Sequence, residues 1–327
     1  MSASRGILGG LMAVLLAVFA AAALAQPAYP SKPVRFIVPY AAGGSVDPLV
    51  RLFTPKLSES LGQQVVVDIR PGGNTIIGTD ALAKSPPDGH TKLATVVTNH
   101  VINALLIPNL PFDSVKDFTP VATVSNTDYV LVLHPSVPAR NLKEFIALAK
   151  SKPGQLNYGS VGSGGISQLG NEHFSMLVGI KMQRVPYKGS ALALIDLVAG
   201  QLQAGFYTPI SFIQYMRSGR LKAIAVSGNN RLQALPEVPT FTEAGLPGFE
   251  MRVTYGVLAP AGTAKPIIDK LSGEFAKIVA LPETRERLSG QGMVPFYTGP
   301  DAMAALMKTD TVKYAQVIKA ANIKLEN

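Results

Sequence analysis

Three times along this chain, a short apolar segment with strand character runs into glycines and hydroxyl side chains and then into a predicted helix. The three junctions lie within VRFIVPYAAGGSVDPLV (Val34–Val50), VVVDIRPGGNTIIG (Val65–Gly78) and LNYGSVGSGGISQL (Leu156–Leu169). The first N–H groups of a helix lack partners within the helix and lie at the positive end of its dipole. Because glycine lets an anion approach these groups closely, each junction predicts a cradle for a carboxylate or phosphate.

The first residues of the chain have the pattern of an export signal. Met1–Arg5 is short and basic, Ile7–Ala22 is almost continuously apolar, and Ala23-Leu24-Ala25 has the small-x-small pattern of a cleavage site before Gln26. An uncleaved membrane anchor is disfavoured because the apolar run is shorter than the roughly 20 residues that span a bilayer. We therefore expect residues 1–25 to be a cleaved signal peptide and the mature protein to be periplasmic.

Composition narrows the classes of partner and chemistry. The formal net charge is +9, but Lys and Arg form no clustered run and Trp is absent, so we expect no nucleic-acid partner. The chain has no cysteine, which excludes thiol catalysis and cysteine metal sites. The basic balance favours an ordinary solvated surface, with modest long-range attraction of anionic ligands as the alternative.

Motifs for catalysis, cofactors or metals are missing from the sequence. It contains neither a Gly-x-Ser-x-Gly nucleophile elbow nor a Gly-x4-Gly-Lys-Ser/Thr phosphate loop. His90, His100, His134 and His173 are scattered without metal-ligand spacing. We therefore expect a protein that is not an enzyme and uses no metal or cofactor. Each histidine is expected to be structural or exposed, and His100 is the best candidate for an exception because it follows Thr98 and Asn99 at the end of the third predicted strand.

Predicted strands and helices alternate along most of the chain, which indicates an α/β fold with largely parallel sheets. The predicted strands are Val34–Val38, Val65–Ile69, Lys92–Val97, Val130–Leu133, Leu156–Tyr158, Arg184–Tyr187, Ala204–Tyr207, Leu221–Val226 and Tyr255–Leu258. Asn141 and Glu144 predict a capping box at the start of one helix. A final helix is expected over about residues 301–321.

Two extended segments, Pro120–His134 and Glu250–Pro260, are predicted to cross between two lobes. Residues 26–127 together with 251–327 would then form the first lobe, and residues 128–250 the second. Ligands of open α/β sheets bind outside the carboxyl ends of the strands, where the glycine junctions fall. A ligand cleft is therefore expected between the lobes.

The chain also resembles a known family, the substrate-binding receptors of tripartite tricarboxylate transporters, also called Bug-type extracytoplasmic solute receptors. The matching segments follow one another in order along the mature chain: Tyr29–Asp47, Leu61–Gly73, Gly78–Thr91, Leu156–Gly165, Val185–Ser190, Leu197–Phe206, Ala234–Glu250 and Tyr255–Thr263. The resemblance implies a type II periplasmic-binding-protein fold that closes on a carboxylate.

It also implies which residues hold the ligand. In that family the loop after the first strand takes a carboxylate through backbone N–H groups, with a second loop beside it and a third on the opposite lobe. Matched to this chain, the implied ligand-binding residues are Tyr40, Ala42, Gly43, Gly44, Ser45 and Asp47, then Gly73, Asn74 and Thr75, then Ser160, Gly162, Ser163, Gly164 and Gly165, and finally Tyr187, Lys188 and Gly189.

Several individual roles stay open at the level of sequence. Ser45 either caps a helix or contacts the ligand, and Asp47 either caps the first turn or binds an amino group of the ligand. We add Thr98 to the site, together with Tyr207, which ends a strand and either faces the cleft with Thr208 or packs within the protein. Family members often carry Asp where this chain has Gln203, so the ligand itself is not specified.

The predicted function is capture of a small carboxylate, such as a dicarboxylate, tricarboxylate, aromatic acid or amino acid, by lobe closure. A monomeric receptor would then deliver the ligand to the membrane permease subunits of a tripartite carrier. One alternative is a receptor that passes its closure to a membrane sensor kinase. Another is an exported hydrolase or lyase, against which the missing nucleophile and base count.

Overall fold

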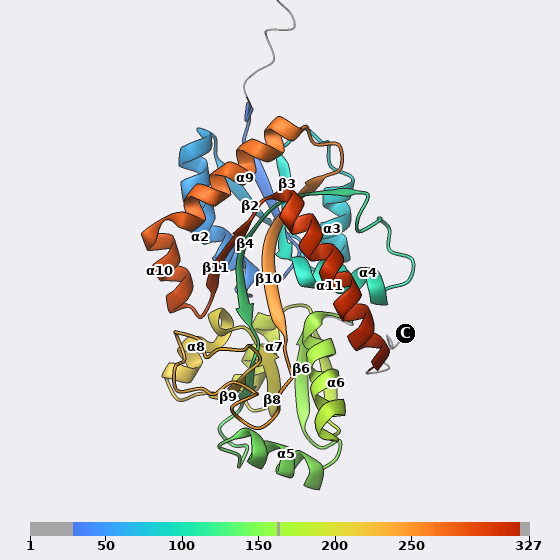
Figure 1. The fold of residues 1–327 in the computed structure, drawn as a ribbon, viewed down its shortest axis with the longest axis vertical. Coiled ribbons are helices and arrows are strands. Elements are labelled where there is room, and N and C mark those ends of the chain that lie inside the picture. Colours follow the sequence, from blue (N-terminus) through green and yellow to red (C-terminus); the bar gives the residue numbers. More distant parts are fainter. Residues whose placement is uncertain (1–28, 162–163, 321–327) are drawn as a thin grey trace, which may run out of the picture.

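The chain folds into two α/β lobes, each built on its own sheet (Figure 1). The computed structural model describes residues 29–161 and 164–320. The first lobe has a six-stranded sheet in the order β11-β4-β10-β3-β1-β2, and the second a five-stranded sheet in the order β7-β6-β8-β5-β9. The strands are β1 (Val34–Val38), β2 (Val65–Ile69), β3 (Thr91–Val96), β4 (Phe118–Asp128), β5 (Val130–Leu133), β6 (Asn157–Val161), β7 (Gln183–Tyr187), β8 (Ala204–Tyr207), β9 (Lys222–Val226), β10 (Arg252–Pro260) and β11 (Val294–Thr298).

Both sheets are mixed. In the first lobe, β1 is parallel to β2 and β3, whereas β10 is antiparallel to β3 and β4. In the second, β6 is parallel to β7 and β8, and β5 is antiparallel to β8 and β9. Antiparallel strands therefore carry the connection between the lobes, a feature that alternation of strands and helices did not predict.

Two neighbouring strands connect the lobes. The chain leaves the first sheet at the end of β4, and only Tyr129 separates β4 from β5 of the second sheet. It returns through β10, whose residue Arg252 pairs with Asp128. In Figure 1, β4 and β10 run side by side from the upper lobe into the lower one. The lobe boundaries at residues 127/128 and 250/251 remain a prediction.

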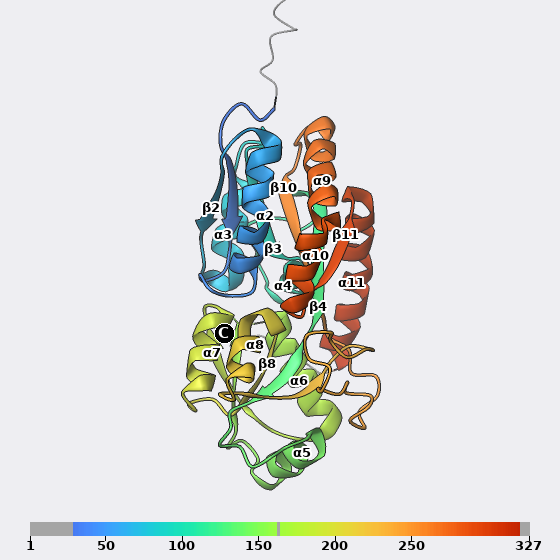
Figure 2. The same ribbon diagram turned by 90° about the vertical axis from the view of Figure 1, so that its left-hand side faces the viewer.

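Helices cover both sheets. Those of the first lobe are α2 (Val46–Leu61), α3 (Ile76–Ala83), α4 (Val97–Leu106), α9 (Lys265–Ala280), α10 (Pro282–Gly290) and α11 (Pro300–Ala320), with a short 3₁₀ turn, η1 (Gly73–Thr75). The second lobe has α5 (Leu142–Ser151), α6 (Ile166–Val178), α7 (Ser190–Val198) and α8 (Pro209–Arg217). Figure 2 shows α7 and α8 at the end of the second lobe that faces the first.

Local sequence explains where several helices begin and end. Asn141 Oδ1 accepts the Glu144 amide at 2.9 Å and Glu144 Oε2 accepts the Arg140 amide at 2.7 Å, so the predicted capping interaction at α5 is confirmed. Helix α2 ends at Gly62, whose left-handed conformation (φ 65°) directs its amide to Glu59 O. The apolar stripe of α2, including Phe53, packs against the sheet.

Aromatic side chains form the centre of the second lobe. Phe174 of α6 and Phe206 of β8 pack with Phe241 and Phe249, and the last two have ring centroids 4.7 Å apart. All four are almost fully buried. Burial of each such ring stabilises the fold by about 1.5–3 kcal/mol.

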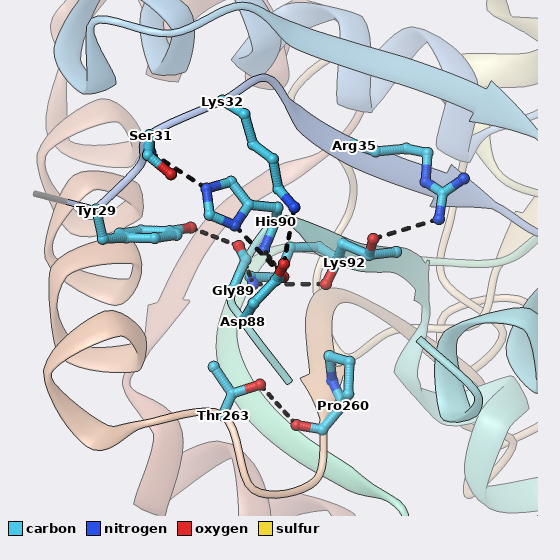
Figure 3. Close-up of polar contacts among 11 residues, drawn as sticks. Tyr29, Ser31, Lys32, Arg35, Asp88, Gly89, His90, Lys92, Pro260 and Thr263 are labelled. Carbon is cyan, nitrogen blue, oxygen red and sulfur yellow. Dashed lines mark hydrogen bonds and ion pairs between the residues drawn. The ribbon is translucent and has the colours of Figure 1, made fainter. Parts of the chain in front are cut away.

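At the far end of the first lobe, a polar cluster fastens the first described residues (Figure 3). The Tyr29 hydroxyl donates to Gly89 O at 2.6 Å, and Lys32 pairs with Asp88 at 3.0 Å. Lys92 of β3 is fully buried, and its amine also donates to Gly89 O, at 2.7 Å. Burial lowers the pKa of Lys92 to about 7.

The structure corrects the prediction around the third strand. β3 ends at Val96 and α4 begins at the next residue, because no glycine or proline separates the two apolar patterns. His100 therefore lies in α4, where its Nε2 is 2.9 Å from Ser114 O and its ring contacts Phe118. It is buried and lines neither of the cavities described below, so it has the structural role expected of the histidines and is not the exception that borders the ligand site.

Candidate ligand-binding cleft

A small cavity of about 40 Å³ lies between the two lobes, here called the inner cavity. The first lobe contributes Tyr40, Ser45, Val96, Asn99 and Val253, and Tyr129 comes from the crossing between the sheets. The second lobe contributes Gly159, Val161, Ile166, Ser167, Ser190, Ala193, Phe206, Tyr207 and Thr208. No charged side chain lines it among the described residues, so its polar groups are hydroxyls, amides and backbone atoms.

A second, wider cavity of about 430 Å³ adjoins the first, and we call it the outer cavity. It shares Tyr40 and Val161 with the inner cavity, so the two form neighbouring parts of one cleft. Its other lining residues are Pro39, Gly72, Gly73, Asn74, Thr75, Ile76, Ile107, Pro186, Tyr187 and Lys188. Lys188 is its one charged lining residue within the described part of the chain.

The N-terminus of α2 provides backbone donors at the inner cavity. Ser45 immediately precedes α2 and lines that cavity. The amides of Ser45 and Val46 meet no acceptor within the described residues. Unpaired amides at the start of a 16-residue helix favour an anion there through both hydrogen bonding and the helix dipole.

Two of the predicted amide donors in this loop already have acceptors. The Gly43 amide donates to Asp47 Oδ2 at 3.0 Å, and the Gly44 amide donates to Ala41 O at 3.3 Å. Arg51 Nε also donates to Asp47 Oδ1 at 2.6 Å, so the Asp47 carboxylate stabilises the loop. Ala42, Gly43, Gly44 and Asp47 do not line either cavity.

Hydroxyl groups surround the same helix end. The Tyr255 hydroxyl is buried and has no hydrogen-bond partner, although the hydroxyls of Ser45 and Thr208 lie close enough to influence its ionisation. Burial raises the pKa of Tyr255 to about 12, while these two neighbours act in the opposite direction. Tyr255 therefore stays a neutral phenol behind the wall of the inner cavity, which it does not line.

The loop after β6 is tied to the opposite lobe. Asn99 Oδ1 of the first lobe accepts the Ile166 amide at 3.0 Å, which occupies the first amide of α6. The Gly164 amide donates to Gln168 Oε1 at 2.8 Å. A Cβ atom at Gly165 would lie 2.8 Å from Asn99 Oδ1, so only glycine permits this approach. The lobes are thus in contact across the cleft.

A second cross-lobe contact lies at Gly189, just before α7. A Cβ atom at Gly189 would lie 2.8 Å from the Cβ of Ala41, and one at Gly44 would lie 3.2 Å from the Ser190 hydroxyl. These distances leave no room for larger side chains on either side. The small residues of the glycine loops therefore allow the two lobes to close on one another.

The second junction lines the outer cavity. Asn74 and Thr75 have left-handed backbone conformations (φ 51° and 77°), an arrangement that costs energy in residues other than glycine. Asn103 of α4 supports both, because its Nδ2 donates to Asn74 O at 2.8 Å and to Thr75 Oγ1 at 3.1 Å. This support from a neighbouring helix holds the loop in its unusual shape.

The predicted residues therefore fall into groups. Tyr40, Ser45 and Tyr207 line the inner cavity, whereas Gly73, Asn74, Thr75, Tyr187 and Lys188 line the outer one together with Tyr40. Ser160, Gly164, Gly165 and Gly189 support the walls without lining either cavity. Thr98 is fully buried in α4, where its Oγ1 accepts the Thr254 amide at 3.1 Å. Gly162 and Ser163 lie outside the described residues.

Sequence reasoning missed other lining residues. Asn99, Tyr129, Ser167, Ser190, Ala193 and Val253 were not assigned to the site. Of these, Tyr129 carried a recognisable signal, because it lies within an extended segment predicted to cross between the lobes. The position of Asn99 had no such signal, since it depends on a helix that the pattern did not indicate.

Two α/β lobes that close on a cavity through paired crossing strands define the chain as a two-lobed periplasmic binding protein. The chain belongs to the tripartite tricarboxylate transporter family of receptors, whose family model matches residues 49–323. The predicted fold class and family are thus confirmed. Within the described residues, no helix has the length and apolar character required to cross a membrane.

Individual relatives cover almost the whole chain. The protein BugT of Bordetella pertussis is 33% identical over 321 residues, which span 97% of this chain and 98% of BugT. R. palustris Rpa4515, solved with adipate, is 30% identical with a TM-score of 0.88 and covers 90% of this chain and 99% of its own. MatC from Rhodopseudomonas palustris, solved with bound malate, is 29% identical with a TM-score of 0.84 and covers 89% and 100%.

Proposed function

We propose that this protein is an extracytoplasmic receptor that captures a small carboxylate between its lobes and delivers it to the permease subunits of a tripartite tricarboxylate-type transporter. The observation that carries the proposal is the inner cavity at the start of α2, which Ser45 lines and where the Ser45 amide lacks an acceptor. The adipate and malate held by two structural relatives support a carboxylate as the ligand class.

The energetics are sufficient for such binding. Each charge-assisted hydrogen bond contributes about 1.5–3 kcal/mol. The two unpaired amides and the Ser45 hydroxyl together supply roughly 4.5–9 kcal/mol, a range that includes the ~8 kcal/mol of micromolar affinity. The backbone donors are already ordered by the helix, so binding loses little conformational entropy.

Closure is proposed to follow docking. The carboxylate binds first at the α2 end of the first lobe, and the second lobe then brings Thr208 and the residues after β6 against it. Contacts such as Asn99 with the Ile166 amide form only when the lobes meet, so they favour the closed state.

A proline substitution tests the amide directly. Ser45 has φ −71°, a value that the proline ring accepts, so Ser45→Pro removes the N–H without strain in that residue's φ. Ser45→Ala is the matched control that removes only the hydroxyl. We expect calorimetric titration with a panel of short carboxylates to show roughly tenfold or greater loss for Ser45→Pro relative to Ser45→Ala. Equal affinities in the two variants would contradict backbone capture of the carboxylate.

Export and delivery need separate tests. N-terminal sequencing of the exported protein should give a chain that starts at Gln26, and a start at Met1 would contradict signal-peptide cleavage. Cells that lack this receptor should lose uptake of the labelled carboxylate and regain it with the wild-type gene. Uptake that is unchanged by the deletion, with an altered transcriptional response to the ligand, would indicate the sensor-kinase alternative instead.

A further inference from the structure

The side chain of Tyr207 occupies an unusual position at the end of β8. Its ring folds back over two glycines: a Cβ atom at Gly205 would lie 2.6 Å from Cε2 of Tyr207, and one at Gly159 would lie 2.9 Å from its hydroxyl oxygen. Gly205 is in the same strand and Gly159 is in the neighbouring strand β6. The two glycines therefore create a recess that the ring fills.

The hydroxyl at the end of this ring has no partner. Tyr207 is only 3% exposed, and its hydroxyl oxygen forms no hydrogen bond. Leu202 and Ala193 approach the same point of β6, so apolar atoms surround the hydroxyl. The nearby Tyr187 hydroxyl donates to Asp196 Oδ2 at 2.6 Å and leaves Tyr207 unpaired.

An unpaired buried hydroxyl destabilises a protein relative to a phenylalanine of the same shape. Burial, together with the charge of Asp196, also raises the pKa of Tyr207 well above its ordinary range, so the phenol remains protonated. Tyr207 thus carries a buried hydrogen-bond donor without an acceptor, beside Gly159, which lines the inner cavity with it.

The walls of the inner cavity define what this donor can meet. Val96 and Val253 line it from the first lobe, and Ile166 and Phe206 from the second. Ser45 and Tyr207 line the same cavity from different lobes. A ligand held at Ser45 by its carboxylate would therefore extend an apolar body between these walls toward Tyr207.

We propose that the Tyr207 hydroxyl determines ligand specificity by donating a hydrogen bond to an uncharged polar group at the far end of the bound carboxylate. This inference rests on the proposed function. The far group is uncharged because, among the described residues, no cationic side chain lines the inner cavity. A second carboxylate there would lose its hydration without gaining a counter-charge. A hydroxyl, keto or amide oxygen satisfies the donor without that penalty.

The test compares ligands that differ only at the far end. For chain lengths of four to six carbons, we would titrate the alkanoate, the ω-hydroxyalkanoate and the α,ω-dicarboxylate into wild-type protein and Tyr207→Phe. At the length that fits best, wild-type protein should bind the hydroxy acid about tenfold more tightly than the alkanoate, and the ratio should fall to about one in Tyr207→Phe. An unchanged ratio in the variant, or a dicarboxylate that binds the wild type more tightly than the hydroxy acid, would overturn the proposal.

Thermal unfolding without ligand provides a second measurement. Tyr207→Phe should have a Tm equal to or above that of the wild type, because the variant removes an unpaired buried hydroxyl. Tyr158→Phe is the matched control in the adjacent strand: its hydroxyl donates to Glu172 Oε1 at 2.5 Å, so its loss should lower the Tm. A Tm loss in Tyr207→Phe as large as that in Tyr158→Phe would show that the Tyr207 hydroxyl serves the fold.

The outcomes separate this inference from the function on which it rests. If wild-type protein binds none of these acids or any other short carboxylate, the proposed function fails. If it binds carboxylates with affinities that Ser45→Pro weakens, but Tyr207→Phe leaves the preference for a polar far end unchanged, only the role of Tyr207 is refuted.

Discussion

Replacing the buried Lys92 by methionine should change how the stability of this protein depends on pH. Lys92 has no exposed surface, and the pKa of its amine is lowered from 10.5 to about 7. Between these two pH values the unfolded chain holds a proton at Lys92 that the folded chain does not. The free energy of unfolding of the wild type should therefore rise with pH in this window.

The magnitude follows from the two pKa values. Below pH 7 the amine is charged in both states and its burial penalty is fully present, whereas above pH 7 folding increasingly uses the neutral form. From pH 7 to pH 9.5, the linkage relation predicts that the free energy of unfolding of the wild type rises by about 3 kcal/mol. The window ends near pH 9.5 because buried tyrosines such as Tyr29, whose pKa is raised by burial, lower stability at higher pH.

The assay is urea denaturation of wild-type protein and Lys92→Met at pH 7.0, 8.0 and 9.5. Lys92→Met should abolish most of the rise while leaving the fold intact, since Gly89 O keeps the Tyr29 hydroxyl as a donor (Figure 3). Lys32→Met is the control: its side chain is 60% exposed in the same cluster, and it should retain the wild-type rise. A rise of the same size in Lys92→Met would refute the assignment to Lys92.

Further predictions concern closure and packing. Gly189→Val should weaken ligand binding roughly tenfold, because its Cβ would lie 2.8 Å from Ala41 Cβ when the lobes meet, and unchanged calorimetric affinity would show that this contact is not needed. Asn99→Ala should weaken ligand binding by about 1–3 kcal/mol, because the Ile166 amide loses its cross-lobe acceptor. Wild-type affinity in this variant, together with a wild-type decrease in the radius of gyration on ligand binding in small-angle scattering, would contradict this prediction. Phe241→Ala should lower the free energy of unfolding by about 3–5 kcal/mol in urea, and a loss below ~1 kcal/mol would contradict its place in the core.

The sequence identified much of the framework because the relevant signals are local. β1, β2, β5 and β8 have the predicted bounds, since each is a short apolar run bordered by residues that end strands. The capping interaction between Asn141 and Glu144 was also predictable, because the two partners are three residues apart. Helix α4 and strand β11 were missed, because neither is separated from its neighbours by a clear change of pattern.

The sequence by itself determined where glycine-rich loops meet helices, because that arrangement depends on neighbouring residues. It did not determine which of the loop amides remain available. Gly43 and Gly164 lose theirs to side chains four residues away, and Ile166 loses its amide to Asn99, which lies 67 residues earlier. The tertiary structure also brings the Tyr255 hydroxyl to the helix that begins after Ser45. Donor availability is a property of packing between distant segments, so only the folded chain decides it.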